Sequence, residues 1–174
     1  MPSMGIYSYE LFKIFDVESI IRIGSCGSYT EDLHLLDLIL AENSYTEGNY
    51  ALTMDNQNVH LAESSFVINQ KIEETASKLG INYKKGTTLC SEVFDAYMAD
   101  ASQLMDRIPK DVSLIGSEME AFALFYNAKK LGKQASCLLT VADDHFHGGV
   151  VTADEREKSL DNMIILALET AITL

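Results

Sequence analysis

Short apolar runs alternate with longer segments whose apolar residues recur at helical spacing. The short runs, rich in Ile, Leu or Val, predict buried strands at Ser19–Gly24, Leu36–Ala41, Val112–Ile115 and Gln134–Val141. The periodic segments predict helices at Tyr7–Phe15, Ser65–Leu79, Glu118–Leu131 and Ala153–Ile172. This alternation is typical of an α/β domain, and we expect a mixed, mainly parallel central sheet flanked by helices.

Two of the predicted helices have recognisable ends. Thr152-Ala153-Asp154-Glu155 fits a capping box, in which the threonine hydroxyl and the glutamate carboxylate bond to the first amides of the last helix. The helix over Glu118–Leu131 is followed by Gly132, a residue that readily adopts the left-handed conformation of a helix C-terminus. No linker, repeat or low-complexity segment divides the chain, so residues 1–174 are predicted to form a single domain.

Composition narrows the classes of partner. The net charge is −13, from 13 basic and 26 acidic residues, and it argues against binding to nucleic acid or to an anionic membrane. The three cysteines are widely spaced and suggest reduced thiols rather than a disulfide framework. The chain starts without a signal peptide pattern, and its longest apolar run near the C-terminus, Met163–Leu168, is too short to cross a bilayer. We expect a cytoplasmic protein.

Ligands of parallel α/β sheets bind beyond the carboxyl ends of the strands, and the first predicted strand ends in a charged, glycine-flanked turn. Arg22 lies between isoleucines, and an arginine there is costly to bury without an anion. Gly24 allows backbone amides to approach that anion, and the Ser25 hydroxyl adds a donor. These residues suit a phosphate site, although an arginine–carboxylate pair beside an ordinary turn would explain them too.

A second cluster follows the strand predicted before the helix at Glu118–Leu131. Glu118 and Glu120 flank Met119, and a carboxylate can accept both hydroxyls of a ribose diol. Acidic residues are also common in the first turn of a helix, because the helix dipole favours them there. The pattern leaves both explanations open.

A third cluster, Asp143-Asp144-His145, directly follows the most apolar of the predicted strands. Adjacent aspartates there would raise one another's proton affinity, as a general acid requires, but a solvated turn is the simpler alternative. Arg156 lies on the first turns of the last helix and could fold back onto this loop. His145 and His147 alone make a poor metal site, so no metal is expected.

Together and in this order, the motifs resemble the hexameric, bacterial (DeoD-type) purine nucleoside phosphorylases of the nucleoside phosphorylase superfamily. The resemblance rests on Ile20–Gly27, Gly116–Ala121, Asp143–Arg156 and, in the last helix, Asp161–Ile164. It covers the whole chain and is least evident over Glu42–Asp111.

The resemblance implies an enzyme that reversibly converts a purine ribo- or deoxyribonucleoside and orthophosphate into free base and pentose 1-phosphate. It assigns phosphate binding to Arg22, Gly24 and Ser25, and nucleoside binding to Phe94, Ser117, Glu118, Met119, Glu120 and Ala142. Asp143 would protonate purine N7, and Arg156 would promote this transfer. It implies no cofactor and a homohexamer arranged as a trimer of dimers.

The sequence departs from the family pattern in two ways. It begins beyond the family's N-terminal phosphate loop, so we expect the first strands of the fold to be missing. Ser117 stands where the family usually has valine, Ala142 where it has serine, and Asp144 where histidine often follows the catalytic aspartate. The base preference is therefore open.

Three alternatives remain. A nucleosidase of the same superfamily would use water in place of phosphate, although Arg22 and Ser25 argue for an oxyanion. Uridine phosphorylase is a second relative, but its pyrimidine-recognising Gln/Arg pair is not evident near Phe94. The third is a catalytically incompetent, truncated subunit that folds by assembling with partners.

Overall fold

The computed structural model describes residues 1–144, 146–152 and 160–174. Its strands are β1 (Ser19–Ser28), β2 (Leu38–Tyr45), β3 (Leu61–Glu63), β4 (Lys84–Cys90), β5 (Leu114–Glu118) and β6 (Gln134–Asp144). Its helices are α1 (Pro2–Lys13), α2 (Tyr50–Asp55), α3 (Phe66–Leu79), the 3-10 helix η1 (Asp95–Tyr97), α4 (Ala101–Arg107), α5 (Ala121–Leu131) and α7 (Asp161–Ala171).

The strands form one sheet in the order β3-β2-β4-β5-β1-β6. Because β6 also pairs with β2, the sheet closes on itself and leaves β3 outside the ring. The pairings β1/β6, β2/β4 and β4/β5 are parallel, and β1/β5, β2/β3 and β2/β6 are antiparallel. The parallel pairings have the longer registers, so the predicted mixed, mainly parallel sheet is confirmed.

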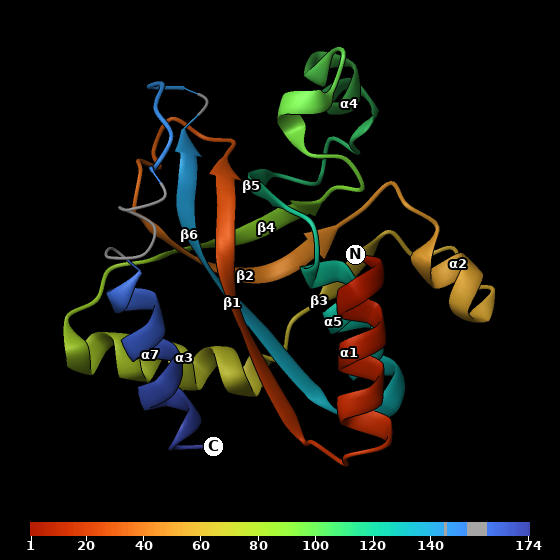
Figure 1. The fold of residues 1–174 in the computed structure, drawn as a ribbon, viewed down its shortest axis with the longest axis vertical. Helices are drawn as coiled ribbons and strands as arrows, with labels where there is room; N and C mark the ends of the chain where they lie inside the picture. Colours follow the sequence, from red (N-terminus) through yellow and green to blue (C-terminus); the bar gives the residue numbers. More distant parts are fainter. Residues whose placement is uncertain (145, 153–159) are drawn as a thin grey trace.

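The long β1/β6 pair organises the molecule. The two strands run side by side from Ser19 opposite Gln134 to Ser28 opposite Asp144, with an irregularity after Cys26. Both arrowheads point to the same end of the sheet in Figure 1, close to the end of β5. The polar residues at the ends of these strands are therefore brought together.

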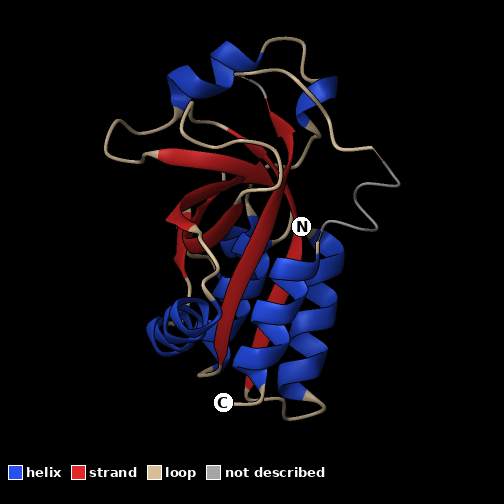
Figure 2. Ribbon diagram, turned by 90° about the vertical axis from the view of Figure 1, so that its left-hand side faces the viewer, coloured by secondary structure: helices blue, strands red, loops and turns tan. Residues whose placement is uncertain are grey.

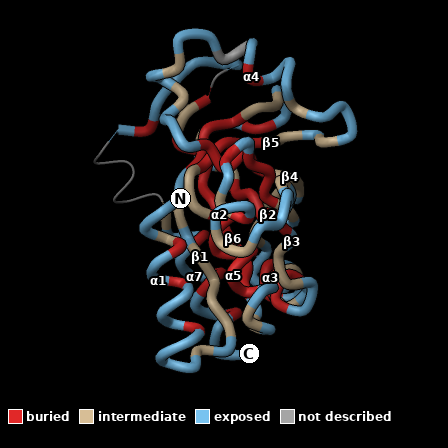
Figure 3. The backbone as a smooth tube through the Cα atoms, turned by 90° about the vertical axis from the view of Figure 1, so that its right-hand side faces the viewer, coloured by how far each residue is buried: buried red, intermediate tan, exposed pale blue. Residues whose placement is uncertain are grey.

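Helices cover two sides of the sheet. The first core cluster contains Phe12 of α1 and most of α5, whereas the second joins Ile68 and Ile72 of α3 to Leu166 of α7. Figure 2 shows these long helices around one end of the strands and the short helices near the other end. Figure 3 shows buried residues in the interior of the molecule, where they belong to the strands and to α5. Among the described residues, no helix is both long and apolar enough to span a membrane.

The four predicted strands and four predicted helices have counterparts, with shifted limits. Helix α5 begins at Ala121 rather than Glu118, because Glu118 still pairs with Cys90 in the sheet. It ends at Leu131, and the capping residue Gly132 has a φ of 66°, which confirms the predicted left-handed terminus. Helix α1 begins at Pro2, five residues before the predicted start. Most of the predicted capping box lies outside the described residues, whose last helix begins at Asp161.

The middle of the chain contains five elements that the hydrophobic pattern did not predict. These are α2, β3, β4, η1 and α4. Strand β4 begins with the polar Lys84 and Lys85 and becomes fully buried only from Thr88. Its pattern is therefore too polar at the start to be recognised as a core strand.

Candidate active site

The ends of β1, β5 and β6 surround a cavity of about 360 Å³. It is lined by Arg22, Gly24, Ser25, Cys26, Gly27, Phe94, Asp95, Ser117, Glu118, Met119, Glu120 and Asp143. All but two of the predicted site residues are in this set. Ala142 lines a neighbouring cavity that shares Gly24 and Ser25, and Arg156 lies outside the described residues.

Arg22 is held by acidic partners at the centre of the cavity. Its Nη2 donates a hydrogen bond to Glu120 Oε2, and its Nη1 lies 3.8 Å from Glu118 Oε2. Nη1 also donates to Cys137 Sγ at 3.4 Å. A side chain only 11% exposed thus obtains the anions that its burial requires. The arginine–carboxylate pair that the sequence left open is the arrangement seen here.

Glycine at position 24 makes this geometry possible. A Cβ atom at Gly24 would lie 2.5 Å from Arg22 Nη1, so any other residue would push the guanidinium aside. The guanidinium lies over the backbone of its own strand and reaches Glu120 at the start of α5. The Ser25 residue beside it is exposed, and its position borders both cavities.

The two glutamates before α5 have different environments. Glu118 is fully buried, and its Oε2 accepts hydrogen bonds from the amides of Glu120 and Ala121, both at 2.8 Å. This carboxylate stabilises the start of the helix, as the dipole argument suggests. Burial raises the pKa of Glu118, and the charge of Arg22 opposes that shift. The Glu120 side chain is 35% exposed and is the one available to a ligand.

The two aspartates at the end of β6 face different regions. Asp143 lines the cavity, whereas the Asp144 side chain is 3% exposed and folds into the following turn. Asp144 Oδ1 accepts from the amides of Phe146 and His147, at 3.0 and 2.9 Å, and Oδ2 lies 3.0 Å from His147 Nδ1.

Those donors, the His147 amide first, lower the pKa of Asp144 to about 2. The expectation that the adjacent aspartates raise one another's proton affinity is therefore wrong for Asp144.

Phe94 and Asp95 form a further wall of the cavity. Tyr29 Oη donates to Asp95 Oδ2 at 2.6 Å, and Ser117 Oγ donates to Asp95 Oδ1 at 3.0 Å. Burial, with Asp95 adding to it, raises the pKa of Tyr29. The Phe94 ring is 44% exposed and contacts the edge of Tyr97, with the ring centres 5.3 Å apart.

Sequence reasoning missed Tyr29 and Asp95 as parts of this wall. The available signal was Ser117, a polar residue at a position where valine is usual, because its hydroxyl needs a partner when buried. Asp95 directly follows the predicted aromatic Phe94 and is that partner.

The cavity as a whole is acidic. Asp95, Glu118, Glu120 and Asp143 face a single arginine among the described lining residues. Such a site can accept hydrogen bonds from ligand hydroxyls and can exchange a proton through Asp143. An anionic ligand would have to bind Arg22, and it would compete for the guanidinium with Glu118 and Glu120.

A family model described as the phosphorylase superfamily matches residues 1–171. The chain belongs to this superfamily. It is 36% identical to the DeoD-type purine nucleoside phosphorylase of Mycoplasma pneumoniae, over 100% of this chain and 72% of that protein. It is 38% identical to that of Mycoplasma genitalium, over 97% of this chain and 70% of the relative. The resemblance to the DeoD-type branch is therefore confirmed, and the chain is shorter than these relatives.

Solved structures agree on the fold of this superfamily member. The futalosine hydrolase of Helicobacter pylori superposes with a TM-score of 0.79 and 18% identity, over 98% of this chain and 74% of that one. The structure of Helicobacter pylori MTAN superposes with a TM-score of 0.79 and 18% identity, over 98% of this chain and 75% of that one. At this identity the similarity shows the shared α/β fold alone.

Proposed function

We propose that this protein catalyses reversible phosphorolysis of purine ribo- and deoxyribonucleosides, giving free base and pentose 1-phosphate. The observation that carries the proposal is the meeting of Arg22, Glu120 and Asp143 in one cavity at the strand ends. These three side chains supply a cation for phosphate, an acceptor for sugar hydroxyls and a proton donor. The identity to DeoD-type phosphorylases supports the same reaction.

The ion pair between Arg22 and Glu120 suggests how the two substrates bind together. Phosphate at Gly24 and Ser25 would take over the Arg22 guanidinium, because a dianion attracts it more strongly than one carboxylate does. Glu120 would then be free to accept hydrogen bonds from the ribose hydroxyls. Glu118 would stay in place, because the α5 amides hold it. Phosphate binding and sugar binding would thus support each other.

Cleavage of the glycosidic bond leaves positive charge on the sugar and negative charge on the purine. Phosphate beside Arg22 would stabilise the sugar cation and then attack its anomeric carbon. Asp143 would donate a proton to purine N7, so that the base leaves as a neutral molecule. Phe94 and Met119 would pack against the base and sugar, with Ser117 and Ala142 nearby. Arg156, outside the described residues, is proposed as the partner that promotes the proton transfer.

A purine nucleosidase is the second candidate, and one observation favours it. The Arg22 guanidinium is already neutralised by Glu118 and Glu120, and the described lining contains no second cation. A water molecule activated by a carboxylate would suit such an acidic cavity. The reaction with and without phosphate separates the two candidates.

The deciding experiment measures release of free base from inosine and from adenosine by the 174-residue chain, with and without orthophosphate. The proposal expects release only with phosphate, accompanied by equimolar ribose 1-phosphate. Release at the same rate without phosphate, with free ribose as product, would establish the nucleosidase. The absence of release under both conditions would contradict catalysis by this chain and favour the incompetent subunit.

The remaining features of the proposal follow the family resemblance of the sequence. We propose a cytoplasmic enzyme that assembles as a hexamer, a trimer of dimers, and uses orthophosphate as co-substrate without an organic cofactor. The buried, free thiols of Cys26, Cys90 and Cys137 suit a reducing compartment. The charge of −13 argues against nucleic acid as a partner.

A further inference from the structure

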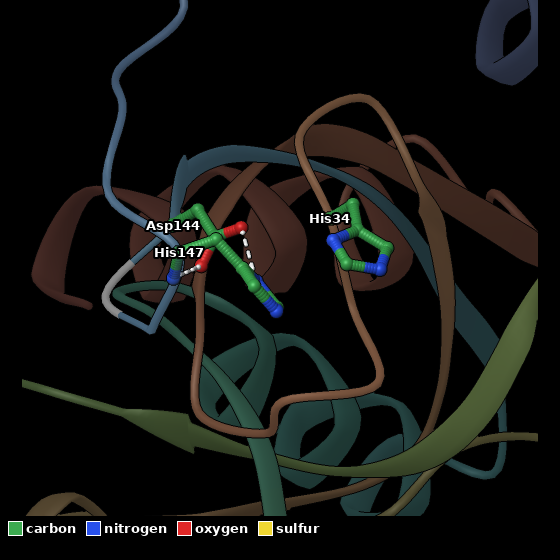
Figure 4. Close-up of side chains that lie close together, drawn as sticks. All are labelled: His34, Asp144 and His147. Atoms are coloured by element: carbon green, nitrogen blue, oxygen red, sulfur yellow. Dashed lines mark hydrogen bonds and ion pairs between the residues drawn. The ribbon is translucent and has the colours of Figure 1, made fainter.

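A cluster of metal-binding side chains lies on the other side of the β6 end from the cavity. His34, Asp144 and His147 each offer a ligand atom, and these atoms lie within 4.8 Å of one another. Figure 4 shows the His147 ring between Asp144 and His34. The two imidazole rings have their centres 4.3 Å apart. The sequence analysis considered only His145 and His147 and expected no metal, because the sequence gave no sign that His34 would lie near them.

Backbone hydrogen bonds hold Asp144 and His147 in one turn after β6. Asp144 accepts the amides of Phe146 and His147 and thereby holds the turn that carries the His147 ring. The turn closes through Gly149, whose carbonyl accepts from the Asp144 amide at 3.0 Å and whose φ is 128°. Gly148 also has a left-handed φ of 74°, which suits glycine.

His34 is held against the same strand by the loop between β1 and β2. The Leu36 amide donates to the Val141 carbonyl, and the Val141 amide donates to the Asp37 carbonyl, both at 2.9 Å. Asp37 Oδ2 in turn accepts from the His34 amide at 2.8 Å. The loop and the turn are thus both attached to β6, so that ligands from distant parts of the sequence are already close.

We propose that His34, Asp144 and His147 bind a divalent transition-metal ion of the zinc class. Two imidazoles and one carboxylate are a ligand set typical of Zn²⁺, with water completing the coordination shell. The ion would replace the hydrogen bond between His147 Nδ1 and Asp144 Oδ2, which lie 3.0 Å apart, so that both atoms become ligands. Asp144 Oδ1 would keep its hydrogen bonds from the amides of Phe146 and His147. Both histidine side chains are exposed, so they have room to turn toward an ion placed between the three ligand atoms.

The charges around the cluster favour a cation. The cluster contains the carboxylate of Asp144, and the chain carries a net charge of −13. Bound metal would tie the β1–β2 loop to the turn after β6. That turn is joined to the active-site strand by the bridge between Asp143 and Val150. The ion would therefore stabilise the segment that follows Asp143 without entering the cavity.

The test is calorimetric titration of Zn²⁺ into the chelator-treated, desalted 174-residue chain at pH 7.5. We expect one saturable site per chain, with an affinity at least about tenfold weaker in both His34→Ala and His147→Ala. His60→Ala is the matched control and keeps the affinity, because His60 contacts Thr46 and lies outside the cluster.

Co²⁺ gives an independent readout that does not depend on heat. The chain should acquire visible absorption of imidazole-bound Co²⁺, and His34→Ala should lose it while keeping the metal-free melting temperature, since His34 is exposed. Absence of saturable Zn²⁺ binding would overturn the proposal. Equal affinity in the native chain, His34→Ala and His147→Ala would overturn it too, by showing that the ion is held elsewhere.

Discussion

The two faces of the β6 end carry adjacent aspartates with different chemistry. Asp143 faces an acidic cavity together with Arg22 and Glu120, where a ligand can reach it. Asp144 faces a turn whose amides and imidazole occupy its oxygens. Alternation along a strand sends neighbouring side chains to opposite faces, so one residue step separates a reactive carboxylate from a structural one.

The largest expected effect is that of Asp143→Asn. An amide cannot donate an acidic proton to the leaving purine, so kcat for inosine phosphorolysis should fall by about 10²-fold or more. The KM for nucleoside should change little. Asp144→Asn is the matched variant, and its kcat should stay far above that of Asp143→Asn. An equal loss of kcat in the two variants would contradict the assignment of a catalytic role to Asp143 and a structural role to Asp144.

Next in size is Arg22→Ala, which removes the cation of the cavity. The KM for phosphate should rise by about 10- to 100-fold, the range expected for lost hydrogen bonds to a charged group, and the KM for inosine much less. Arg107→Ala is the control, because Arg107 pairs with Glu47 at the surface. Equal increases in both KM values would count against a phosphate role for Arg22.

Asp144 should affect the stability of the protein in a pH-dependent way, rather than the binding of substrate. The pKa of Asp144 is about 2, below the ordinary value of about 3.9, so its stabilising effect is complete above about pH 4 and is lost as pH falls through 2. Asp144→Asn should therefore lower the melting temperature by a few degrees at pH 7 and by progressively less below pH 4.

The exposed residue Asp106 on α4 provides the control for this pH experiment. Asp106→Asn should leave the melting temperature within about 1 °C of the native value at both ends of the range, as surface substitutions generally do. A constant difference between the native chain and Asp144→Asn from pH 7 to pH 2 would show that the charge of Asp144 is not the cause.

The smallest effect concerns the Phe94 wall. Tyr29→Phe removes the hydroxyl that holds Asp95 Oδ2, and the KM for nucleoside should rise by about two- to tenfold with phosphate KM unchanged. Tyr97→Phe, at a ring that is 80% exposed, should change neither value. A rise in the KM for phosphate in Tyr29→Phe would contradict this prediction, because it would show that Tyr29 and Asp95 support phosphate binding.

The sequence predicted the strand ends well because each carries its own local signal. Arg22 stands out inside an apolar strand, and Asp143 directly follows another. The rule that ligands bind at strand ends then places such residues together without knowledge of the strand order. The closure of the sheet by β2 and β6 had no such signal, because it depends on pairing between distant segments.

The side-chain partnerships were harder to foresee. Tyr29, Asp95 and Ser117 meet across a wide range of sequence, and so do His34 and His147. Short elements such as α2 and β3 hold too few residues for a period to show. The family resemblance selected Asp143 of the two adjacent aspartates, and Asp143 does line the cavity. The hydrophobic pattern alone could not make that choice, because it depends on strand register, which the β1/β6 pairing sets.

Phosphate bound beside Arg22 is the proposed nucleophile, and the fate of labelled phosphate oxygen shows whether it attacks the sugar. The 174-residue chain is incubated with inosine and ¹⁸O-labelled phosphate, and the sugar product is examined by mass spectrometry. We expect ribose 1-phosphate that retains all the phosphate label, because the attacking oxygen comes from phosphate. Unlabelled free ribose as the sugar product would contradict this expectation and identify water as the nucleophile.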